Sequence, residues 1–360
     1  MYRAFIIGLG RIAFLMEDDS FRTSPCTHAK SYESHENIDL LGGFDIEQSQ
    51  CDRFKEKYPD VKTSSSDLKS TLYDLKPNLI SICTSSSAHL DIVKIVCEYS
   101  RNHELLGVLL EKPVGMNTAE ASQIQLLFQD TGVNVLVCHD RRFYSNYSYY
   151  KSLIKKRGFG KLKSIHGEIH CGSFVKKEKG KKINSFFGGP LLHDGTHLFD
   201  LMIWYAGLPL SVSALASQEK SNLLSEDTCI GSIFFDDNVL GTFLVGGMRK
   251  YFHFEIVLEW ERAKLVDSHG HIQFYQKTKD SPFLKVKKLK MPVGVNPFMN
   301  RLNHLLDIIE LKVPNKSTIQ DGLDAVKVID SIYNSCQNRG TLVHLDDKNT
   351  PKNLMILDRS

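Results

Sequence analysis

The stretch that decides the fold is Ala4-Phe5-Ile6-Ile7-Gly8-Leu9-Gly10-Arg11-Ile12-Ala13. Four apolar residues typical of a buried strand run directly into a turn with two glycines, and we expect a helix to follow. Gly8 would permit the tight bend, Gly10 the close approach of a phosphate, and Ala13 the packing of the helix on the strand. The stretch predicts a cradle for a dinucleotide pyrophosphate, made by Gly8, Leu9, Gly10, Arg11 and Ile12. A glycine turn without a ligand is the alternative.

The first part of the chain alternates between two kinds of apolar pattern. Four further strand-like runs follow the opening one, at residues 40–45, 79–83, 105–110 and 133–138. Segments with helical spacing lie between them, including residues 88–96 and 118–128. Buried strands separated by helices predict a parallel sheet covered on both faces, as in a doubly wound Rossmann domain.

The pattern changes after residue 140. A connecting helix is expected at residues 144–157, one helix among strands at 191–205, and two helices at 297–311 and 319–337. The strand candidates are residues 162–174, 210–216, 229–235, 239–245, 252–259 and 272–275. We therefore predict an α/β protein with three parts. These are a Rossmann domain at residues 1–140, an α+β domain with an open, mostly antiparallel sheet at residues 141–345, and a tail at residues 346–360.

Composition limits the classes of partner and compartment that are expected for the chain. The chain of 360 residues is 42% hydrophobic and carries a formal net charge of +3, with no long basic patch, so nucleic acid is not an expected partner. No signal peptide and no apolar stretch long enough for a bilayer is seen, so no membrane association is expected. The 8 cysteines are scattered without a Cys-x-x-Cys pair, which favours reduced thiols in a cytoplasmic protein.

Polar residues that follow the second and third predicted strands are candidates for binding the cofactor. Asp45 ends the second strand, where a carboxylate would accept hydrogen bonds from a ribose and repel a 2′-phosphate, so NAD is favoured over NADP. The acid normally lies about 20 residues beyond the glycines. We attribute the longer gap here to an insertion at residues 15–26. Thr84, Ser85 and His89 follow the third strand and leave room for a dinucleotide, although capping of the next helix explains the hydroxyls equally well.

Glu111-Lys112-Pro113 ends the fourth predicted strand, at the sheet edge where α/β proteins bind ligands. Lys112 there would hold a substrate oxygen and stabilise a developing alkoxide. The proline makes a cis Lys112–Pro113 bond accessible. A surface lysine before a turn is the alternative.

His193 and His197 are one helical turn apart on the helix expected at residues 191–205, so they share a face. A histidine can take the proton of a hydroxyl while hydride leaves the same carbon. Two histidines at this spacing can also bind zinc. The glutamate of a His-Glu-x-x-His site is absent, and no metal is predicted. The lysine-rich residues 176–182 precede this helix; a solvated loop is favoured over a site for an anionic substrate.

These segments together resemble the Gfo/Idh/MocA family of sugar and cyclitol oxidoreductases over nearly the whole chain. The matching segments are residues 8–11, Asp45, residues 84–89, residues 111–113, residues 141–143, residues 158–162 and residues 188–200. The resemblance implies a Rossmann domain followed by an α/β domain whose open sheet often mediates oligomerisation. It also implies that Lys112 and His197 match the family's catalytic lysine and histidine.

The chain departs from the family at the catalytic helix. The family commonly has Asp-x-Gly-x-His, and here His193 takes the aspartate position with Asp194 beside it. His193 would orient His197, relay a proton or bind a substrate oxygen. We predict an NAD-dependent dehydrogenase that acts on a ring hydroxyl or ketone of a sugar or sugar derivative, phosphorylated and nucleotide-linked sugars included. We expect it to be a homodimer or homotetramer. A non-catalytic NAD or sugar sensor and a reductase of a non-sugar carbonyl are the alternatives.

Overall fold

The computed structural model describes residues 1–172, 188–218 and 225–345. The chain forms two compact units. The first contains residues 1–115, 119–145 and 294–323, and the second contains residues 116–118, 146–293 and 324–360. The lysine-rich residues 176–182 and the tail predicted at residues 346–360 lie outside the described residues.

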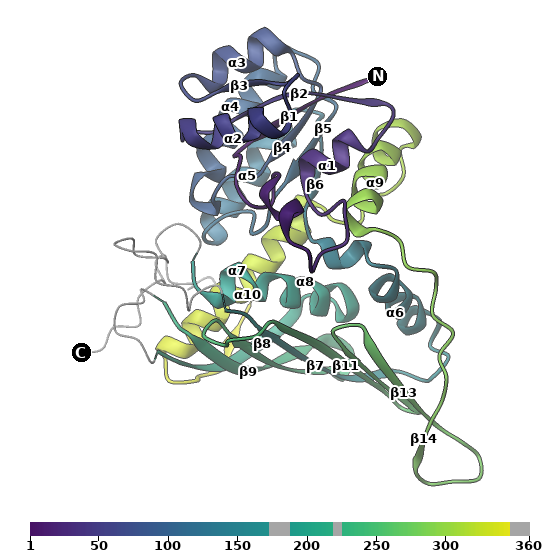
Figure 1. Ribbon diagram of the computed structural model, residues 1–360. Helices are drawn as coiled ribbons and strands as arrows, with labels where there is room; N and C mark the ends of the chain where they lie inside the picture. Colours follow the sequence, from purple (N-terminus) through teal and green to yellow (C-terminus); the bar gives the residue numbers. More distant parts are fainter. Residues whose placement is uncertain (173–187, 219–224, 346–360) are drawn as a thin grey trace. The chain divides into compact units, whose positions relative to one another are not determined.

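A six-stranded parallel sheet forms the centre of the first unit (Figure 1). Its strands are β1 (Tyr2–Ile7), β2 (Ile38–Phe44), β3 (Lys62–Ser64), β4 (Leu79–Ile82), β5 (Gly107–Leu110) and β6 (Asn134–Val137). Their order, β3-β2-β1-β4-β5-β6, is that of a Rossmann domain. The prediction of a parallel sheet is confirmed. The sequence did not indicate β3, because this strand has only three residues, Lys-Thr-Ser, and no apolar run.

Helices on the two faces of this sheet complete the first unit. They are α1 (His28–Glu33), α2 (Gln48–Lys57), α3 (Leu68–Leu75), α4 (His89–Ser100), α5 (Thr118–Gln129) and α9 (Pro297–Leu311). Helix α9 comes from the part of the chain predicted to belong to the second domain. It joins the first unit because Leu302, Leu305 and Leu306 are buried in the same core as Leu79 and Leu109 of the sheet.

The helix expected directly after the glycine turn is interrupted. Residues 11–14 form turns, the 3₁₀ helix η1 (Leu15–Asp18) follows, and α1 begins only at His28. The amide of His28 donates to the carbonyl of Ile12 (3.2 Å), and that of Ala29 donates to the carbonyl of Ala13 (2.9 Å). The two pieces are therefore joined by helix-like hydrogen bonds across the intervening residues, as expected for an insertion looped out of a first helical turn.

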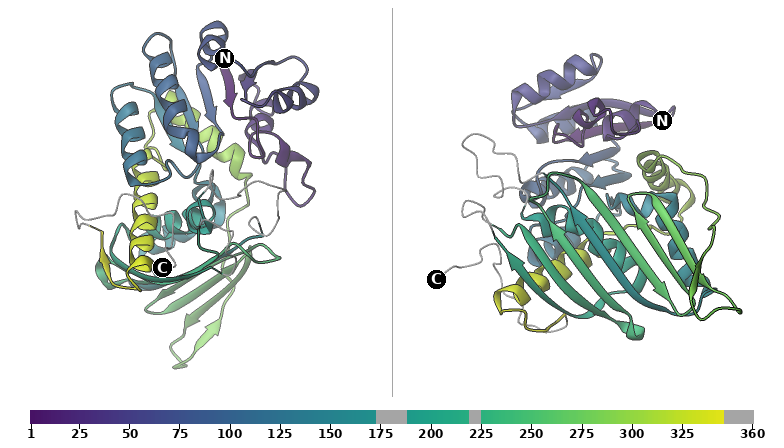
Figure 2. Two further views of the ribbon diagram at one scale, coloured as in Figure 1. Left: turned by 90° about the vertical axis from the view of Figure 1, so that its left-hand side faces the viewer. Right: turned by 60° about the horizontal axis from the view of Figure 1, so that its bottom comes forward.

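A nine-stranded, mostly antiparallel sheet dominates the second unit (Figure 2). Its order is β14-β13-β12-β11-β7-β10-β9-β8-β15, and only the β7–β10 pair is parallel. The strands are β7 (Leu162–His170), β8 (Pro209–Ser217), β9 (Thr228–Phe235), β10 (Leu240–Gly246), β11 (His253–Trp260), β12 (Ala263–Ser268), β13 (His271–Lys277), β14 (Leu284–Val286) and β15 (Val343–His344). This confirms the predicted sheet type.

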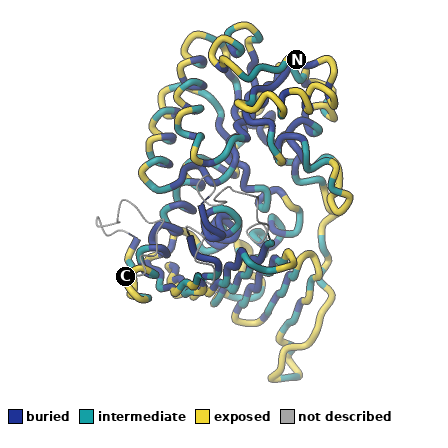
Figure 3. The backbone as a smooth tube through the Cα atoms, turned by 60° about the vertical axis from the view of Figure 1, so that its left-hand side comes forward, coloured by how far each residue is buried: buried dark blue, intermediate teal, exposed yellow. Residues whose placement is uncertain are grey.

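One face of this sheet packs against helices. The helices are α6 (Ser145–Lys156), α7 (Pro190–His193), α8 (Gly195–Ala206) and the part of α10 (Ile319–Gln337) from Asp324 onward. Helix α8 lies close against β7, because a Cβ added at Gly167 would be 2.3 Å from the Leu198 side chain. The rings of Phe199 and Phe243 meet edge to face 5.0 Å apart. Buried residues concentrate in the strands and in the helix faces packed on them (Figure 3).

No helix in the described part of the chain is both long enough and apolar enough to cross a membrane.

Candidate functional site

The glycine turn after β1 is built as its sequence requires. Gly8 has φ +89°, and a Cβ added there would lie 2.6 Å from the amide nitrogen of Thr84. Only glycine fits this position, because the backbone is left-handed and the neighbouring strand end is in contact. A Cβ added at Gly10 would meet no atom within 4 Å, so Gly10 borders open space. That is the arrangement expected where a ligand, rather than the protein, approaches the second glycine.

Asp45 connects the glycine turn to the end of β2. Its Oδ2 accepts a hydrogen bond from the Leu9 amide (2.7 Å), and its Oδ1 accepts one from the Glu47 amide (2.9 Å). The carboxylate is therefore held beside the turn. Each carboxylate oxygen can accept more than one hydrogen bond, so acceptor capacity remains for a ribose hydroxyl. The assignment of Asp45 to the ribose stays a prediction.

The hydroxyl residues after β4 do not cap the following helix, contrary to one interpretation of the sequence. The 3₁₀ helix η2 (Ser86–Ala88) comes first, and neither it nor α4 receives a side-chain cap. The Oγ1 of Thr84 is buried without a hydrogen-bond partner. His89 is fully buried, with Nδ1 3.3 Å from the Val114 carbonyl oxygen, and burial lowers its pKa. His89 is therefore a neutral internal group behind the turn.

Four features around the glycine turn are compatible with a bound dinucleotide. Gly8 supplies the bend, Gly10 borders open space, Asp45 offers a fixed carboxylate, and Thr84 presents an unpaired buried hydroxyl. Because a buried polar atom without a partner is unfavourable, the Thr84 hydroxyl is itself a reason to expect a bound polar group here.

Lys112 lies two residues beyond the end of β5, at the carboxyl edge of the parallel sheet. Its side chain is partly exposed, and its amide donates to Oε2 of Glu111 (3.3 Å). The Lys112–Pro113 bond is cis, the isomer that the sequence made accessible. The predicted lysine is therefore placed where α/β sheets bind ligands.

A chain of buried hydrogen bonds holds Glu111. The Tyr32 hydroxyl lies 2.6 Å from Ser81 Oγ, which lies 2.7 Å from His28 Nδ1, and His28 Nε2 lies 3.0 Å from Glu111 Oε1. One assignment satisfies the last two contacts: Ser81 donates to Nδ1, and His28 donates from Nε2 to the carboxylate. The Arg301 NH2 group, 3.2 Å from Nε2, then makes no hydrogen bond to the imidazole and acts on it through its charge. Burial and the charge of Arg301 lower the pKa of His28 to about 4, so the imidazole is neutral.

Glu111 is ionised although it is buried. Burial by itself would raise the pKa of this carboxyl, but the hydrogen bond from His28 and the charges of Arg301 and Lys112 lower it to about 2. Arg301, from α9, is 1% exposed and contacts two carboxylates. Its NH1 is 2.5 Å from Oδ1 of Asp140 on the 3₁₀ helix η3 (Asp140–Phe143) and 3.7 Å from Oε1 of Glu111.

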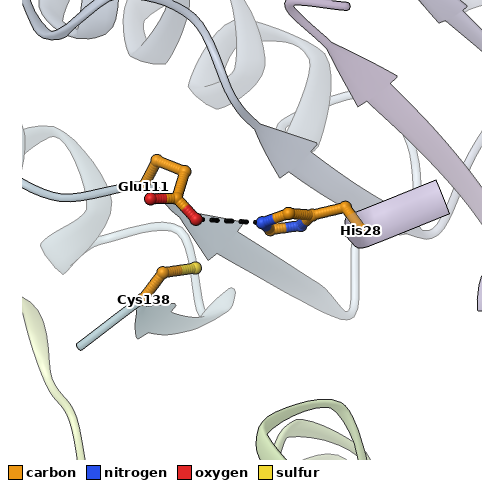
Figure 4. A group of neighbouring side chains, drawn as sticks. All are labelled: His28, Glu111 and Cys138. Atoms are coloured by element: carbon orange, nitrogen blue, oxygen red, sulfur yellow. Dashed lines mark hydrogen bonds and ion pairs between the residues drawn. The ribbon is translucent and has the colours of Figure 1, made fainter. Parts of the chain in front are cut away.

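The residues around His28 and Glu111 also invite comparison with a hydrolytic triad and with a metal site. Ser81, His28 and Glu111 follow the hydrogen-bond order of a hydrolytic triad, but Ser81 is 0% exposed and no substrate can reach its hydroxyl. The ligand atoms of His28, Glu111 and Cys138 lie within 4.8 Å of one another (Figure 4). The guanidinium of Arg301 is 3.2 Å from His28 Nε2, so a metal cation would be repelled by a fixed positive charge. The cluster is an internal charge network.

The two predicted histidines lie at a helix junction in the second unit. The single helix expected there is split at Asp194 into α7 and α8, with His193 ending one and His197 in the first turn of the other. His193 Nδ1 is 3.2 Å from Oδ1 of Asp194. All three side chains are partly exposed. Lys112 belongs to the first unit and these histidines to the second, so their joint action stays a prediction.

Sequence reasoning missed Arg301, Asp140 and His28. One signal was present for the arginine. In α9, Phe298, Arg301, Leu302 and Leu305 share one helix face, so the arginine occupies a position that the apolar spacing assigns to the core. An arginine at such a position requires a buried acidic partner.

Comparisons with known proteins agree with this architecture. Residues 2–139 match the NAD-binding Rossmann fold of the oxidoreductase family GFO_IDH_MocA, and residues 151–345 match its C-terminal alpha/beta domain. The chain belongs to the Gfo/Idh/MocA oxidoreductase family. The resemblance inferred from its motifs is confirmed.

Individual relatives are distant. The chain is 26% identical over 174 residues to the uncharacterized oxidoreductase YhhX of Escherichia coli, spanning 48% of each protein. It is 23% identical over 226 residues to D-glucoside 3-dehydrogenase of the same species, spanning 60% of this chain and 58% of the relative. The chain thus matches only part of the length of these curated relatives. The WlbA dehydrogenase of Bordetella pertussis, solved with NADH and UDP-GlcNAcA, shares the fold with a TM-score of 0.75 at 16% identity, over 96% of this chain and 99% of that one.

Proposed function

We propose that this protein is an NAD-dependent dehydrogenase that transfers hydride between the nicotinamide and a ring hydroxyl or ketone of a sugar or sugar derivative. The observation that carries the proposal is Lys112 at the carboxyl edge of a dinucleotide-binding sheet, with its backbone amide bound to an ionised, buried Glu111. A protein that only senses its ligand has no need for such a lysine. Family membership and the retained His197 support the same conclusion.

The proposed mechanism assigns a task to each side chain. NAD bound at the glycine turn supplies the hydride acceptor. Lys112 binds the hydroxyl oxygen and stabilises the negative charge that grows on it as the carbonyl forms. His197 accepts the hydroxyl proton. His193, paired with Asp194, orients His197 or passes the proton onward.

The substrate class rests on the relatives. The name of one curated relative states a glucoside as its substrate, and one solved neighbour holds a nucleotide sugar. We therefore propose a neutral or nucleotide-linked sugar for this chain. A panel of free sugars, cyclitols and nucleotide sugars, tested for NADH formation, identifies the substrate. NAD binding without turnover of any member would favour the sensor.

Variants test the assigned roles once a substrate is known. Lys112→Ala and His197→Ala should each lower single-turnover NADH formation by about 100- to 10,000-fold, while NAD affinity measured by titration changes little. Lys94→Ala and His271→Ala are matched controls, because both side chains are exposed on helix α4 and strand β13, respectively. Near-parental rates in both Lys112→Ala and His197→Ala would refute the mechanism.

We propose NAD rather than NADP because of Asp45. A carboxylate fixed beside the glycine turn would lie against the 2′-phosphate of NADP, and like charges repel. Asp45→Ala should therefore reduce the preference for NAD in titrations with both cofactors. Unchanged discrimination would remove Asp45 from this role.

We also propose that the protein self-associates through the sheet of the second unit, as a homodimer or homotetramer. On the face that the helices leave open, Leu215 is 58% exposed, Ile230 57% and Leu240 53%. Leu215 pairs with Ile230 across β8 and β9, and Ile230 with Leu244 across β9 and β10, so Leu215, Ile230 and Leu244 form one apolar row. Leu240 pairs with the exposed Phe234 on the same two strands, β9 and β10. Contiguous exposed apolar surface of this kind is typical of a protein interface.

A further inference from the structure

Two thiols from distant parts of the chain meet in the second unit. Cys229 lies in β9, Cys336 lies in the last turn of α10, and their positions in the sequence differ by 107 residues. Both are free cysteines, and their sulfur atoms are 3.8 Å apart. This distance fits a weak hydrogen bond between two thiols. The sulfurs of a disulfide are about 2.0 Å apart, so closing a bond here requires an approach of about 1.8 Å.

The segment of α10 around Cys336 is fastened to the sheet. The hydroxyl of Tyr333, one helical turn earlier, donates to Oε1 of Glu226, just before β9 (3.1 Å). Oγ of the adjacent Ser335 accepts a hydrogen bond from the Ala214 amide in β8 (2.9 Å). These bonds hold the Cys336 thiol opposite its partner. Each sulfur therefore meets the other at a far higher effective concentration than in a flexible chain.

The two thiols differ in how easily a reagent can reach them. Cys229 is 0% exposed, whereas Cys336 is partly exposed. The hydrogen bond with Cys336 and burial both raise the pKa of Cys229, so Cys229 is a protonated thiol at neutral pH. Attack on a disulfide requires both access and a thiolate. We therefore expect Cys336 to react first with a reagent from solution, and Cys229 to react with the product.

We propose that Cys229 and Cys336 are a site of reversible oxidation by low-molecular-weight disulfides, at which an intramolecular disulfide fastens the end of α10 to β9. This proposal does not rest on dehydrogenase activity.

The reaction takes place in two exchange steps. The Cys336 thiolate attacks one sulfur of the small disulfide, which forms a mixed disulfide and releases one small thiolate. Cys229 then loses its proton and attacks the Cys336 sulfur, which forms the Cys229–Cys336 bond and releases the second small thiolate. The two small thiolates take up the protons that the two cysteines have lost. Two protein thiols are thereby oxidised, and one small disulfide is reduced to two thiols.

Oxidised glutathione is the probe for this reaction. The full chain is equilibrated with mixtures of oxidised and reduced glutathione, quenched with acid, alkylated in urea and mapped by peptide mass spectrometry. Peptides linked through Cys229 and Cys336 should accumulate as the mixtures become more oxidising, and dithiothreitol should separate them. Cys51 and Cys97 are buried in the first unit and serve as internal controls, which should carry no glutathione.

Single variants should stop the reaction at different steps. Cys229→Ser keeps the accessible thiol and removes the second one, so the mixed disulfide between glutathione and Cys336 should become the main product. Cys336→Ser removes the accessible thiol, so Cys229 should stay reduced. Cys171→Ser is the matched control, because Cys171 is also buried in the second unit, and it should form the linked peptides as the parent does.

Thermal unfolding shows whether the bond fastens α10 to β9. The crosslink joins residues whose sequence positions differ by 107, so it restricts the unfolded chain strongly. The oxidised parent should unfold roughly 5–15 °C above the reduced parent, and Cys336→Ser treated in the same way should show no such shift. An unchanged midpoint in the fully crosslinked parent would contradict the proposed fastening.

The experiment on the parent decides the inference even if a variant does not fold. Glutathione on Cys336 without any linked peptide would overturn it, because the two sulfurs would then be unable to approach. Reduced Cys229 and Cys336 in oxidised glutathione alone would overturn it as well. Glutathione on Cys229 in Cys336→Ser would contradict the proposed order of attack. None of these results depends on turnover of a sugar, so they are distinguishable from failure of the proposed function.

Discussion

Glu226 makes stability depend on pH in a direction opposite to that of most carboxylates. It is 0% exposed, just before β9, and its Oε1 accepts hydrogen bonds from the Leu191 amide (2.8 Å) and the Tyr333 hydroxyl (3.1 Å). Its Oε2 has no partner. A Cβ added at Gly189 would be 2.4 Å from Oε2, so the carboxyl is closely enclosed. Burial raises the pKa of Glu226 to about 7, against two hydrogen bonds that lower it.

Proton linkage gives the sign and the size of the pH dependence of the free energy of unfolding. The pKa of Glu226 is higher in the folded state than its ordinary value of 4.5, so the native state holds a proton that the unfolded state has released between these two values. This stabilisation is complete below pH 4.5 and is lost as the pH rises through about 7. Each pKa unit corresponds to about 1.4 kcal/mol. Ionisation of Glu226 therefore lowers the free energy of unfolding by about 3 kcal/mol in total.

Glu226→Gln should remove this loss. The amide keeps an oxygen acceptor for Leu191 and Tyr333 and cannot ionise. Urea unfolding can be followed by tryptophan fluorescence at several pH values between about 5.5 and 8.5. The 2 tryptophans, Trp204 in α8 and Trp260 in β11, both belong to the second unit and report on the unit that contains Glu226.

The variant should gain stability over the parent as the pH rises, reaching about 2 kcal/mol across that interval. Glu36→Gln is the control, because Glu36 is exposed, and its curve should run parallel to that of the parent. A difference between Glu226→Gln and parent that is constant with pH would refute the assignment of a buried, neutral carboxyl near neutrality.

Two further predictions concern the cofactor site and the proposed interface. Gly8→Ala should abolish measurable NAD binding in a titration, because the Cβ would lie 2.6 Å from the Thr84 amide nitrogen at φ +89°; Gly10→Ala, where the Cβ meets open space, should leave the free energy of unfolding close to parental but weaken NAD binding. Parental NAD affinity in both variants would show that the cofactor binds at another site. Ile230→Lys should lower the molar mass measured by light scattering to that of one chain, and Glu36→Gln should not; an unchanged mass in Ile230→Lys would remove this face from the assembly.

Much of the fold could be predicted because its strands carry near-continuous apolar runs. The boundaries of α9 and α10 agree with the predicted ranges, since both helices are amphipathic; α9 is followed by its C-cap Lys312, and α10 ends at Gln337. Short edge elements such as β3 and β15 could not be predicted, because strands of two or three residues leave no periodic signal. The place of α9 in the first unit was also hidden, because an apolar helix face does not specify which core it joins.

The site was predictable where a motif stands in one stretch of sequence, as for Gly8, Asp45 and Lys112. It was not predictable where partners come from distant parts of the chain. Arg301 is 161 residues from Asp140 and 273 from His28, and only tertiary packing brings them together. The prediction of a helix directly after the glycine turn was wrong for a local reason. The 3₁₀ helix η1 and its flanking turns are inserted within the first turn of that helix.

The way in which that insertion is looped out also explains how His28 contacts both the glycine turn and Glu111. Hydrogen bonds from His28 to Ile12 and from Ala29 to Ala13 keep α1 in register with the glycine turn, as if the intervening residues were absent. His28 is thereby fixed to the turn through the backbone and to Glu111 through its imidazole, and Glu111 in turn accepts the Lys112 amide. The turn proposed to bind the pyrophosphate and the lysine proposed to bind the substrate oxygen are thus joined by one chain of hydrogen bonds through His28 and Glu111. The insertion is tied to the same helix, because Oε2 of Glu17 accepts hydrogen bonds from the Cys26 amide and from the hydroxyl of Thr27, the N-cap of α1. A change at His28 should therefore disturb both ends of this chain.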